Sequence, residues 1–247
     1  LFVSMVDPNS TWQQVLTMPG MPHTNTAMLE VSHLPPLNLE ERLDYLIRYP
    51  HGCIEQTTSS VFPQLFLSNL MPLEESQKLA IQKNVSAGID RLKTFQVSSG
   101  GFGYWPGQAA SQWGTNYAGH FLLEAKALGY ALPSGMLEQW TSYQREEAQS
   151  WANNGRDSDQ LVQAYRLFGL ALARAPALSA MNRLKEADNL RLQARWRLAA
   201  AYHLAGKPEV AKNLITGQST ETQAYNGHGN TYGSALRDQA LILDTLA

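Results

Sequence analysis

This chain has 247 residues, of which 44% are hydrophobic and 16% are charged, so it can bury a core and is not disordered. Its formal net charge is -2 without a long run of either sign, which argues against nucleic acid or a membrane surface as a partner. No hydrophobic run reaches the length of a transmembrane helix, and no signal peptide pattern follows residue 1. We therefore expect a fragment of a larger protein, with any export signal or lipid anchor outside it.

The first 37 residues differ in character from the rest of the chain. Residues 27–32 alternate apolar and polar side chains, which is the pattern of an edge strand. Pro35 and Pro36 then end this pattern. We predict an extended or β connecting segment over residues 1–37 and one helical domain over residues 38–247.

From residue 38 onward, the hydrophobic periodicity is that of helices, and strand patterns nearly vanish. A glycine-rich stretch at 98–107 interrupts this periodicity. In the longest expected helix, Ile81, Val85 and Ile89 form the inward face. The predicted fold class is all-α, built of consecutive helix pairs. The nine expected helices span residues 38–49, 53–70, 74–96, 112–128, 133–151, 157–172, 185–205, 208–214 and 232–246.

Cys53 is the single cysteine of the chain, so it cannot form an intrachain disulfide. A cysteine without context is more often a small buried hydrophobic residue than a reactive group. Gln56 follows three residues later, and if a helix begins near Cys53 the thiol and the carboxamide lie on one face. The Gln56 side-chain carbonyl can then acylate the thiol with loss of ammonia, which gives an internal thioester. Gly52 would allow a tight turn into this helix.

The eight-residue string Tyr49-Pro50-His51-Gly52-Cys53-Ile54-Glu55-Gln56 resembles the thioester motif of the alpha-2-macroglobulin and complement family, and of its bacterial alpha-2-macroglobulins in particular. Residues 100–106 resemble the turn motif of alpha/alpha toroids, and residues 111–118 and 234–240 resemble the bacterial family. The resemblance implies a thioester between Cys53 and Gln56 in an alpha/alpha toroid, a fold in which paired helices form a ring. A complete toroid has more helices than the nine expected here, so we expect the last pair to be missing.

The resemblance also implies a function, which is that of a single-use protease trap rather than an enzyme. A target protease cuts a bait region in another domain, the thioester becomes accessible, and Gln56 becomes linked to a protease lysine. The implied partners are target proteases and neighbouring domains of the same chain. The implied location is the periplasm, where a lipid outside this chain would provide any anchor to the inner membrane. We expect no cofactor, and no metal either, because the histidines lack metal-ligand spacing.

Tyr49 and Pro50 precede the turn at Gly52, and we expect them to shield the thioester from water by contact with a neighbouring domain. The alternative for Tyr49 is a hydrophobic staple on the preceding helix. The alternative for Cys53 is a protease-like nucleophile, which needs a paired histidine. His51 could serve only if the backbone turned sharply.

Two other functions remain open. An alpha/alpha toroid can be a glycoside hydrolase, for which Asp157 and Asp159 are the candidate carboxylates, although both fit helix capping better. Residues 199–211 resemble a tetratricopeptide turn, which would suit a helical-repeat adaptor, but no regular repeat supports this reading.

In this family, the presence of one histidine distinguishes the thioester proteins that react with hydroxyls from those that do not. The complement members that react with hydroxyls carry one in a segment that corresponds here to about residues 139–159, and this segment holds none. We therefore expect the thioester to form lysine amides rather than esters. His120 lies in an apolar helix and is interpreted as a core histidine.

Overall fold

The structure of the chain is a computed structural model. It describes residues 45–153, 157–222, 231 and 233–246, and before them positions 4–7, 9–15, 17, 20, 21, 23–25, 29 and 31. Contacts divide the chain into two units, residues 1–45 and 46–247. The described positions of the first unit before residue 45 form turns, bends or irregular backbone. Most of the helix expected at 38–49, most of the strand expected at 27–32 and the predicted boundary after residue 37 lie outside the described residues. Of the described part of that helix, residues 45 and 46 are helical and residues 47–49 are not.

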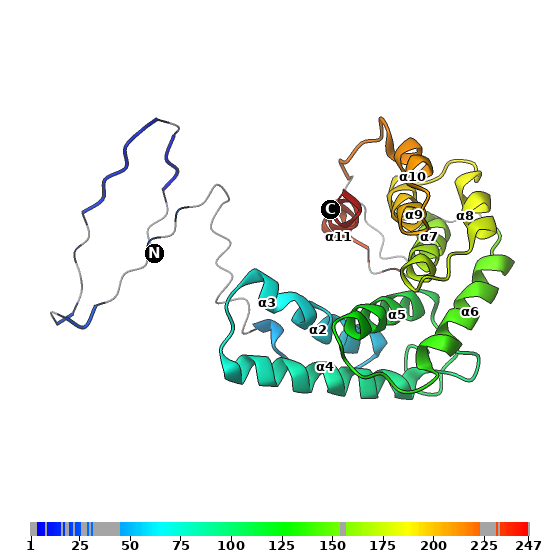
Figure 1. Cartoon of the computed structure of the whole chain (residues 1–247), viewed down its shortest axis with the longest axis horizontal. Coiled ribbons are helices and arrows are strands. Elements are labelled where there is room, and N and C mark those ends of the chain that lie inside the picture. The colour runs from blue at the N-terminus through cyan, green and yellow to red at the C-terminus, as the bar shows by residue number, and fades with distance from the viewer. Residues whose placement is uncertain are drawn as a thin grey trace. The chain divides into compact units, whose positions relative to one another are not determined.

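The helical unit consists of two series of helices. The inner series is α2 (Ile54–Val61), α5 (Gln112–Ala127), α7 (Asp157–Leu172), α9 (Leu192–Leu204) and α11 (Ala235–Leu246). The outer series is α4 (Glu75–Phe95), α6 (Met136–Ser150), α8 (Leu178–Lys185) and α10 (Pro208–Ile215). Each inner helix packs against the next, and α4, α6 and α8 each pack against the inner helices before and after them (Figure 1). This arrangement confirms an all-α domain of consecutive helix pairs.

The helix expected at 53–70 is wrong as a single element. The structure has α2, then a 3-10 helix at Pro63–Phe66 (η1) and a short helix at Leu67–Leu70 (α3). Pro63 lacks a backbone N–H, and its ring does not fit inside a continuing helix, so α2 ends before it. Phe62, the last residue before the proline, donates its N–H to the Thr58 carbonyl at 2.9 Å.

The helix expected at 185–205 also differs from the structure. Residues 178–185 form α8, which the sequence reading missed, and residues 186–191 form a turn before α9. Asn189 has a positive φ of 52°, the left-handed conformation that ends helices and that asparagine tolerates well. Lysine, glutamate and alanine in this stretch favour a helix by propensity, so the local pattern hid the break.

The hydrophobic core cluster lies mainly between α7, α8, α9 and α10 and includes Leu167, Met181 and Leu198. The predicted inward face of α4 is confirmed, since Ile81, Val85 and Ile89 are buried. Glycines let the helices approach one another closely. A Cβ added at Gly119 on α5 would lie 2.2 Å from the Trp140 ring on α6, and one at Gly88 on α4 would lie 2.9 Å from Val61 on α2.

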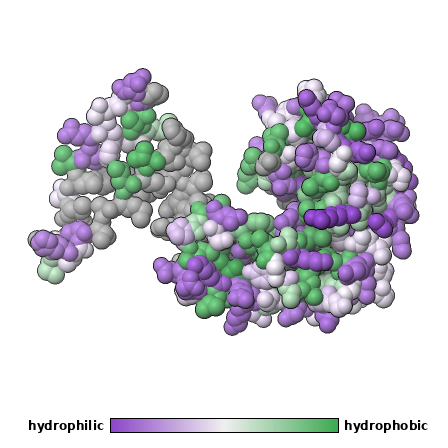
Figure 2. Space-filling view, viewed as in Figure 1, coloured by the Kyte–Doolittle hydropathy of each residue, from purple (hydrophilic) through white to green (hydrophobic). Residues whose placement is uncertain are grey.

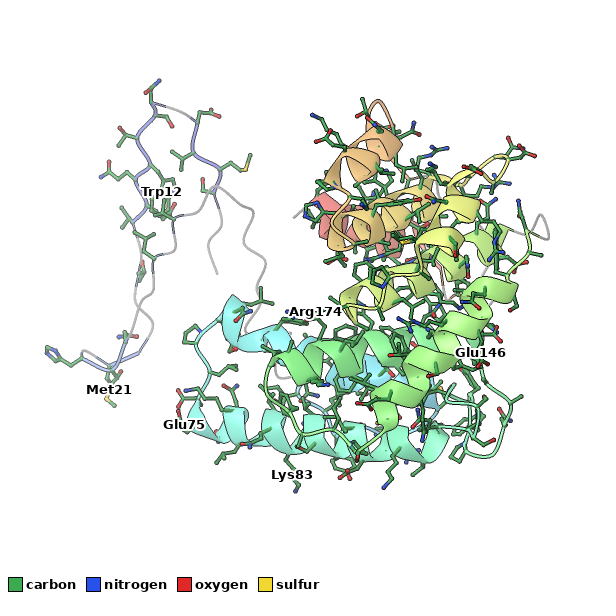
Figure 3. All side chains as sticks on the ribbon, turned by 45° about the vertical axis from the view of Figure 1, so that its right-hand side comes forward. Trp12, Met21, Glu75, Lys83, Glu146 and Arg174 are labelled. Carbon is green, nitrogen blue, oxygen red and sulfur yellow. The ribbon has the colours of Figure 1, made fainter. Side chains whose placement is uncertain are left out.

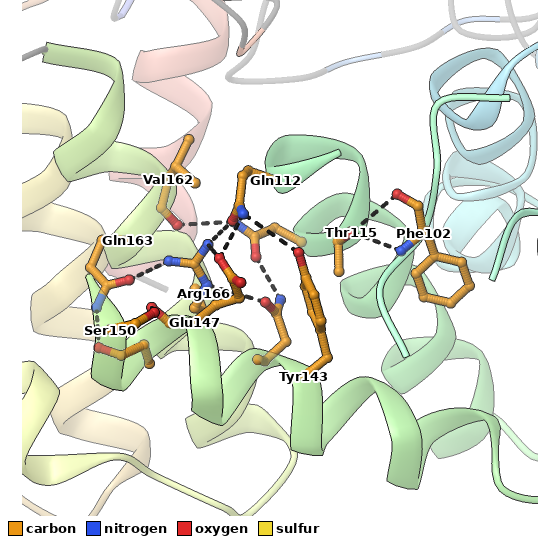
Figure 4. Close-up of polar contacts among 12 residues, drawn as sticks. Phe102, Gln112, Thr115, Tyr143, Glu147, Ser150, Val162, Gln163 and Arg166 are labelled. Carbon is orange, nitrogen blue, oxygen red and sulfur yellow. Dashed lines mark hydrogen bonds and ion pairs between the residues drawn. The ribbon is translucent and has the colours of Figure 1, made fainter. Parts of the chain in front are cut away.

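Arg166 on α7 is the centre of a buried polar network between α5, α6 and α7 (Figure 4). Its guanidinium donates hydrogen bonds to the side-chain oxygens of Gln112, Gln144 and Gln163. Gln112 in turn donates to the Glu147 carboxylate at 2.6 Å. Burial lowers the pKa of Arg166 from its ordinary value, and the Glu147 charge opposes this shift. A paired network of this kind fixes how the three helices pack.

The outer surface of the helical unit is mostly polar. Glu75 and Lys83 on α4 and Glu146 on α6 point away from the core (Figure 3). Hydrophobic side chains reach the visible face over α2 and α3, where Leu70 is exposed (Figure 2). Among the described helices, none is long and apolar enough to cross a membrane.

Candidate functional site

Cys53 lies at the N-terminus of α2, the first helix of the inner series. It is the N-cap residue of α2, with an extended backbone (φ -75°, ψ 177°), and only 3% of it is exposed. Its thiol is free in the structure. The expectation that a helix begins at this cysteine is therefore confirmed, and the sulfur is both buried and at the start of the first turn.

Gln56 occupies the third position of α2, and its side chain folds back over the N-terminus. The side-chain oxygen Oε1 accepts a hydrogen bond from the backbone N–H of Cys53 at 3.1 Å, as in a capping box. The structure thus brings Cys53 and Gln56 together, as their spacing predicted. Gln56 is an exposed residue whereas Cys53 is buried.

Gly52 makes this arrangement possible in two ways. Its φ of 88° belongs to the region that side chains with a Cβ rarely adopt. A Cβ at this position would also lie 2.0 Å from Oε1 and 2.9 Å from Cδ of Gln56. Only a glycine leaves room for the Gln56 carboxamide above the turn.

Arg91 on α4 contacts the residues on either side of the Cys53–Gln56 pair. Its Nη2 donates to the Gly52 carbonyl at 2.6 Å, and its Nε donates to the Thr57 hydroxyl at 3.2 Å. The guanidinium carbon lies 5.5 Å from the centre of the Phe95 ring, in cation–π geometry. Sequence reasoning missed this residue. The available signal was an arginine three residues after Gly88, on the face of α4 that packs against α2.

Two further contacts hold the turn in place. The backbone N–H of Ile54 donates to the Tyr104 carbonyl at 3.2 Å, which joins α2 to the glycine-rich loop. Buried Gln64 donates to the carbonyls of Arg48 and Ser60 and accepts from Asn84 on α4. The segment that enters the site is therefore fixed at both ends.

The other residues of the motif differ in exposure, and the side chains of His51 and Glu55 have hydrogen-bond partners other than the thiol. Tyr49 is 59% exposed, and Pro50 is buried. His51 is exposed, and its Nδ1 lies 3.0 Å from the Tyr49 carbonyl oxygen, which accepts the hydrogen bond. The Glu55 carboxylate accepts from the Ser59 hydroxyl at 3.0 Å. The histidine nearest in sequence is thus bonded to backbone rather than to Cys53.

His120 is a core histidine, as expected. Its Nδ1 lies 3.0 Å from the Tyr165 hydroxyl, and its ring meets Phe62 edge to face at 4.9 Å. Burial lowers the pKa of His120, and the bond to Glu124 opposes this. Phe62 ends α2 whereas Cys53 begins it, a separation of roughly 13 Å along the helix axis. His120 therefore packs at the end of α2 far from the thiol.

The structure offers little for the alternative functions. The side chain of Asp157 lies outside the described residues, and Asp159 is partly buried on α7. In the part of the chain that the structure describes, no three His, Cys, Asp or Glu side chains are grouped to hold a metal ion.

Known proteins match this chain over most of its length. A family model described as "A-macroglobulin TED domain" matches residues 26–155. Alpha-2-macroglobulin from Escherichia coli (strain K12) is 28% identical over 264 residues, which cover 98% of this chain and 16% of that protein. The alpha-2-macroglobulin from Xylella fastidiosa (strain Temecula1) is 27% identical over 243 residues, which cover 90% of this chain and 14% of that protein.

Solved structures agree in fold. Salmonella alpha-2-macroglobulin reacted with methylamine is similar with a TM-score of 0.74 and 29% identity, over 86% of this chain and 15% of that one. Escherichia coli alpha-2-macroglobulin activated by porcine elastase is similar with a TM-score of 0.66 and 27% identity, over 80% of this chain and 19% of that one. These similarities confirm the alpha/alpha toroid. The chain spans only 16% of the length of the E. coli relative.

Proposed function

This chain belongs to the A-macroglobulin TED domain family, and from that premise we propose that Cys53 and Gln56 form an internal thioester that captures proteases covalently. The chain is the thioester-domain part of a bacterial alpha-2-macroglobulin. The observation that carries the proposal is the hydrogen bond from the Cys53 N–H to Gln56 Oε1, which holds the acyl group on the turn that also carries the thiol.

Closure of the thioester requires one substitution at the Gln56 carbonyl. The Cys53 sulfur attacks Cδ, the C–N bond breaks, and Nε2 leaves as ammonia with the proton of the thiol. The two groups are three residues apart in one turn, so closure is intramolecular and benefits from a high effective concentration. A thioester lasts only where water is kept from the acyl carbon, and Gln56 is exposed in this chain, so the proposal requires a neighbouring domain to cover it.

Capture is the reverse kind of substitution, with a protease amine as the nucleophile. A neutral lysine amine attacks Cδ, the C–S bond breaks, an amide forms, and the Cys53 sulfur takes up the proton that the amine loses. The event happens once per molecule, without turnover. A protease cut in another part of the full-length protein would expose the site by a conformational change, so cleavage controls access and the thioester does the chemistry.

Tyr49 and Pro50 belong to the shield of the thioester in this proposal. The 59% exposure of Tyr49 leaves an aromatic surface beside the site for a neighbouring domain of the same protein to cover. The periplasm, with a lipid anchor to the inner membrane supplied from outside this chain, is the proposed location.

The test is the intact mass and the thiol content of the freshly prepared full-length protein. The protein should be lighter than its sequence by one ammonia, and methylamine should release one thiol at Cys53 and add one amine at Gln56. Cys53→Ala should remove both changes and abolish covalent capture while leaving the fold intact, because little volume is lost.

A glycoside hydrolase or a helical-repeat adaptor would show none of these changes. A Cys53 thiol that titrates freely in the fresh, untreated protein, together with an unreduced mass, would refute the thioester. The assay therefore separates the thioester protein from both alternatives in one preparation.

A further inference from the structure

We propose that Arg91 is a positioning residue for the thioester, and that its charge activates the Gln56 acyl group through the Gly52–Cys53 peptide. This inference rests on the proposed function. The two groups that Arg91 binds are the Gly52 carbonyl and the Thr57 hydroxyl, which lie immediately before Cys53 and immediately after Gln56. One guanidinium therefore fixes both ends of the reacting turn.

The Gly52–Cys53 peptide group connects the charge of Arg91 to the reacting carbonyl. Its oxygen accepts from Arg91 Nη2 at 2.6 Å, a short distance typical of a charge-assisted bond. Its N–H donates to Gln56 Oε1 at 3.1 Å. Hydrogen bonds in such a chain polarise one another, so the guanidinium makes the Cys53 N–H a stronger donor toward Oε1.

Oε1 is the atom on which negative charge develops. When the Cys53 sulfur attacks Cδ during closure, or an amine attacks it during capture, the carbonyl electrons move onto Oε1 in the tetrahedral intermediate. In both steps Oε1 stays in place, while Nε2 leaves in the first and the sulfur leaves in the second. A donor aimed at a developing oxyanion lowers the barrier to both steps.

The rest of the Arg91 environment suits this role. Thr57 is fully buried, and the guanidinium lies over the Phe95 ring on its own helix, so the side chain is held in one direction. Arginine can bind the carbonyl and the hydroxyl at once because its donors form a planar fork, whereas lysine offers a single point charge. A lysine at position 91 should keep the positive charge near the Gly52 carbonyl but lose the hydrogen bond to the Thr57 hydroxyl.

The experiment compares the parent full-length protein with Arg91→Met, Arg91→Gln and Arg91→Lys. Intact mass gives the fraction of molecules that carry the thioester, and thiol release gives the rate constant for methylamine. A direct oxyanion donor is worth about 10²–10³ in rate, so an effect relayed through one peptide should be about tenfold. We expect the methionine and glutamine variants to lose thioester or to react about tenfold more slowly, and the lysine variant to recover most of the rate.

Arg183→Met is the matched control. Arg183 also donates to backbone carbonyls, those of Ala148 and Gln149 at 2.7 and 2.8 Å, but at the end of α6. Its loss should lower the unfolding temperature without changing the methylamine rate. This control separates a loss of stability from a loss of activation.

The outcomes decide between the claims. A parent protein without a thioester refutes the proposed function itself. A reactive parent with methionine and glutamine variants of parental yield and rate overturns the role of Arg91 alone. If Arg91→Lys reacts with methylamine no faster than Arg91→Gln, activation by charge is overturned. This comparison does not need Arg91→Met, so it remains decisive even when that variant fails to fold.

Discussion

Gly52 is the residue at which the fold and the proposed chemistry can be separated. Gly52→Ala places a Cβ 2.0 Å from Gln56 Oε1, so the carboxamide must leave its position beside Cys53. The backbone at a φ of 88° adds strain of about 1–2 kcal/mol for an L-residue. We expect a folded protein in which the thioester no longer forms, seen as an unreduced intact mass and a titratable thiol before any amine is added.

Gly107→Ala provides the control for this prediction. Gly107 has a similar φ of 79°, and a Cβ there meets nothing within 4 Å. It should therefore carry the same kind of backbone strain and keep a full yield of thioester. If Gly52→Ala protein were also lighter by one ammonia at full yield, the observed turn would not be the one that closes.

At the scale of residues, the sequence identifies the proposed reacting pair, Cys53 and Gln56, but not the side chain that supports it. Cys53 and Gln56 are near neighbours, and their spacing alone predicts a contact across one helical turn. Arg91 reaches the same turn from a helix that begins 22 residues after Cys53 in the chain. The packing of α4 on α2 creates that contact, and the spacing of Arg91 from Gly88 indicates only the face of α4 on which Arg91 lies, not that it meets Gly52.

At the scale of elements, long amphipathic helices were predictable and interruptions were not. The span of α4 matches its prediction within one residue at each end, because its buried face repeats over about four turns. The break at Pro63 and the turn at Asn189 depend on single residues inside otherwise helical patterns. Such a break can change which of the following helices are inner and which are outer. The hydrophobic periodicity of the sequence stays helical on both sides of the break and does not reveal it.

His120 on α5 contacts Phe62 at the end of α2 and Tyr165 on α7. Its titration predicts how the unfolding free energy depends on pH. Burial lowers its pKa below the ordinary value of about 6.5. Arg197 also lowers this pKa, while Glu124 and Asp244 raise it. Below pH 6.5 the unfolded chain therefore binds more protons than the folded one. The unfolding free energy should fall as the pH drops from 7 to 5.5, with a slope of up to about 1.4 kcal/mol per pH unit.

Denaturant unfolding at several pH values measures this slope. His120→Gln removes the titrating group and should flatten the slope over that window. His203 is exposed on α9, so His203→Gln is the control and should leave the slope as it is. A His120→Gln variant with the parental slope would show that other groups cause the pH dependence.

For the whole molecule, the prediction concerns the bond that capture leaves behind. The segment 139–159 has no histidine, and His120 packs at the far end of α2 from Cys53. Neither this segment nor His120 then supplies a histidine beside the thioester that would activate a hydroxyl. A lysine, with a reference pKa of about 10.4, has a small neutral fraction near pH 7, but a bound protease presents it at high local concentration. We therefore expect lysine amides.

The measurement is hydroxylamine treatment of the protease adduct at alkaline pH, with an ester-linked acyl protein treated alongside to show that esters are cleaved. Amides should persist, and most of the protease should stay attached. Release of most of the protease would mean ester bonds and would require a base that reaches the site from elsewhere in the full-length protein.

The hydrogen bond from the Cys53 N–H to Gln56 Oε1 has one more consequence, which concerns mass action. An amide formed with methylamine is the same kind of bond as the carboxamide from which the thioester closes. The turn that favours closure from one should favour closure from the other, so the level of free amine sets the balance. A small amine that diffuses away would let the ring close again. A lysine on a bound protease stays beside the acyl group, and its residence time is what makes capture lasting.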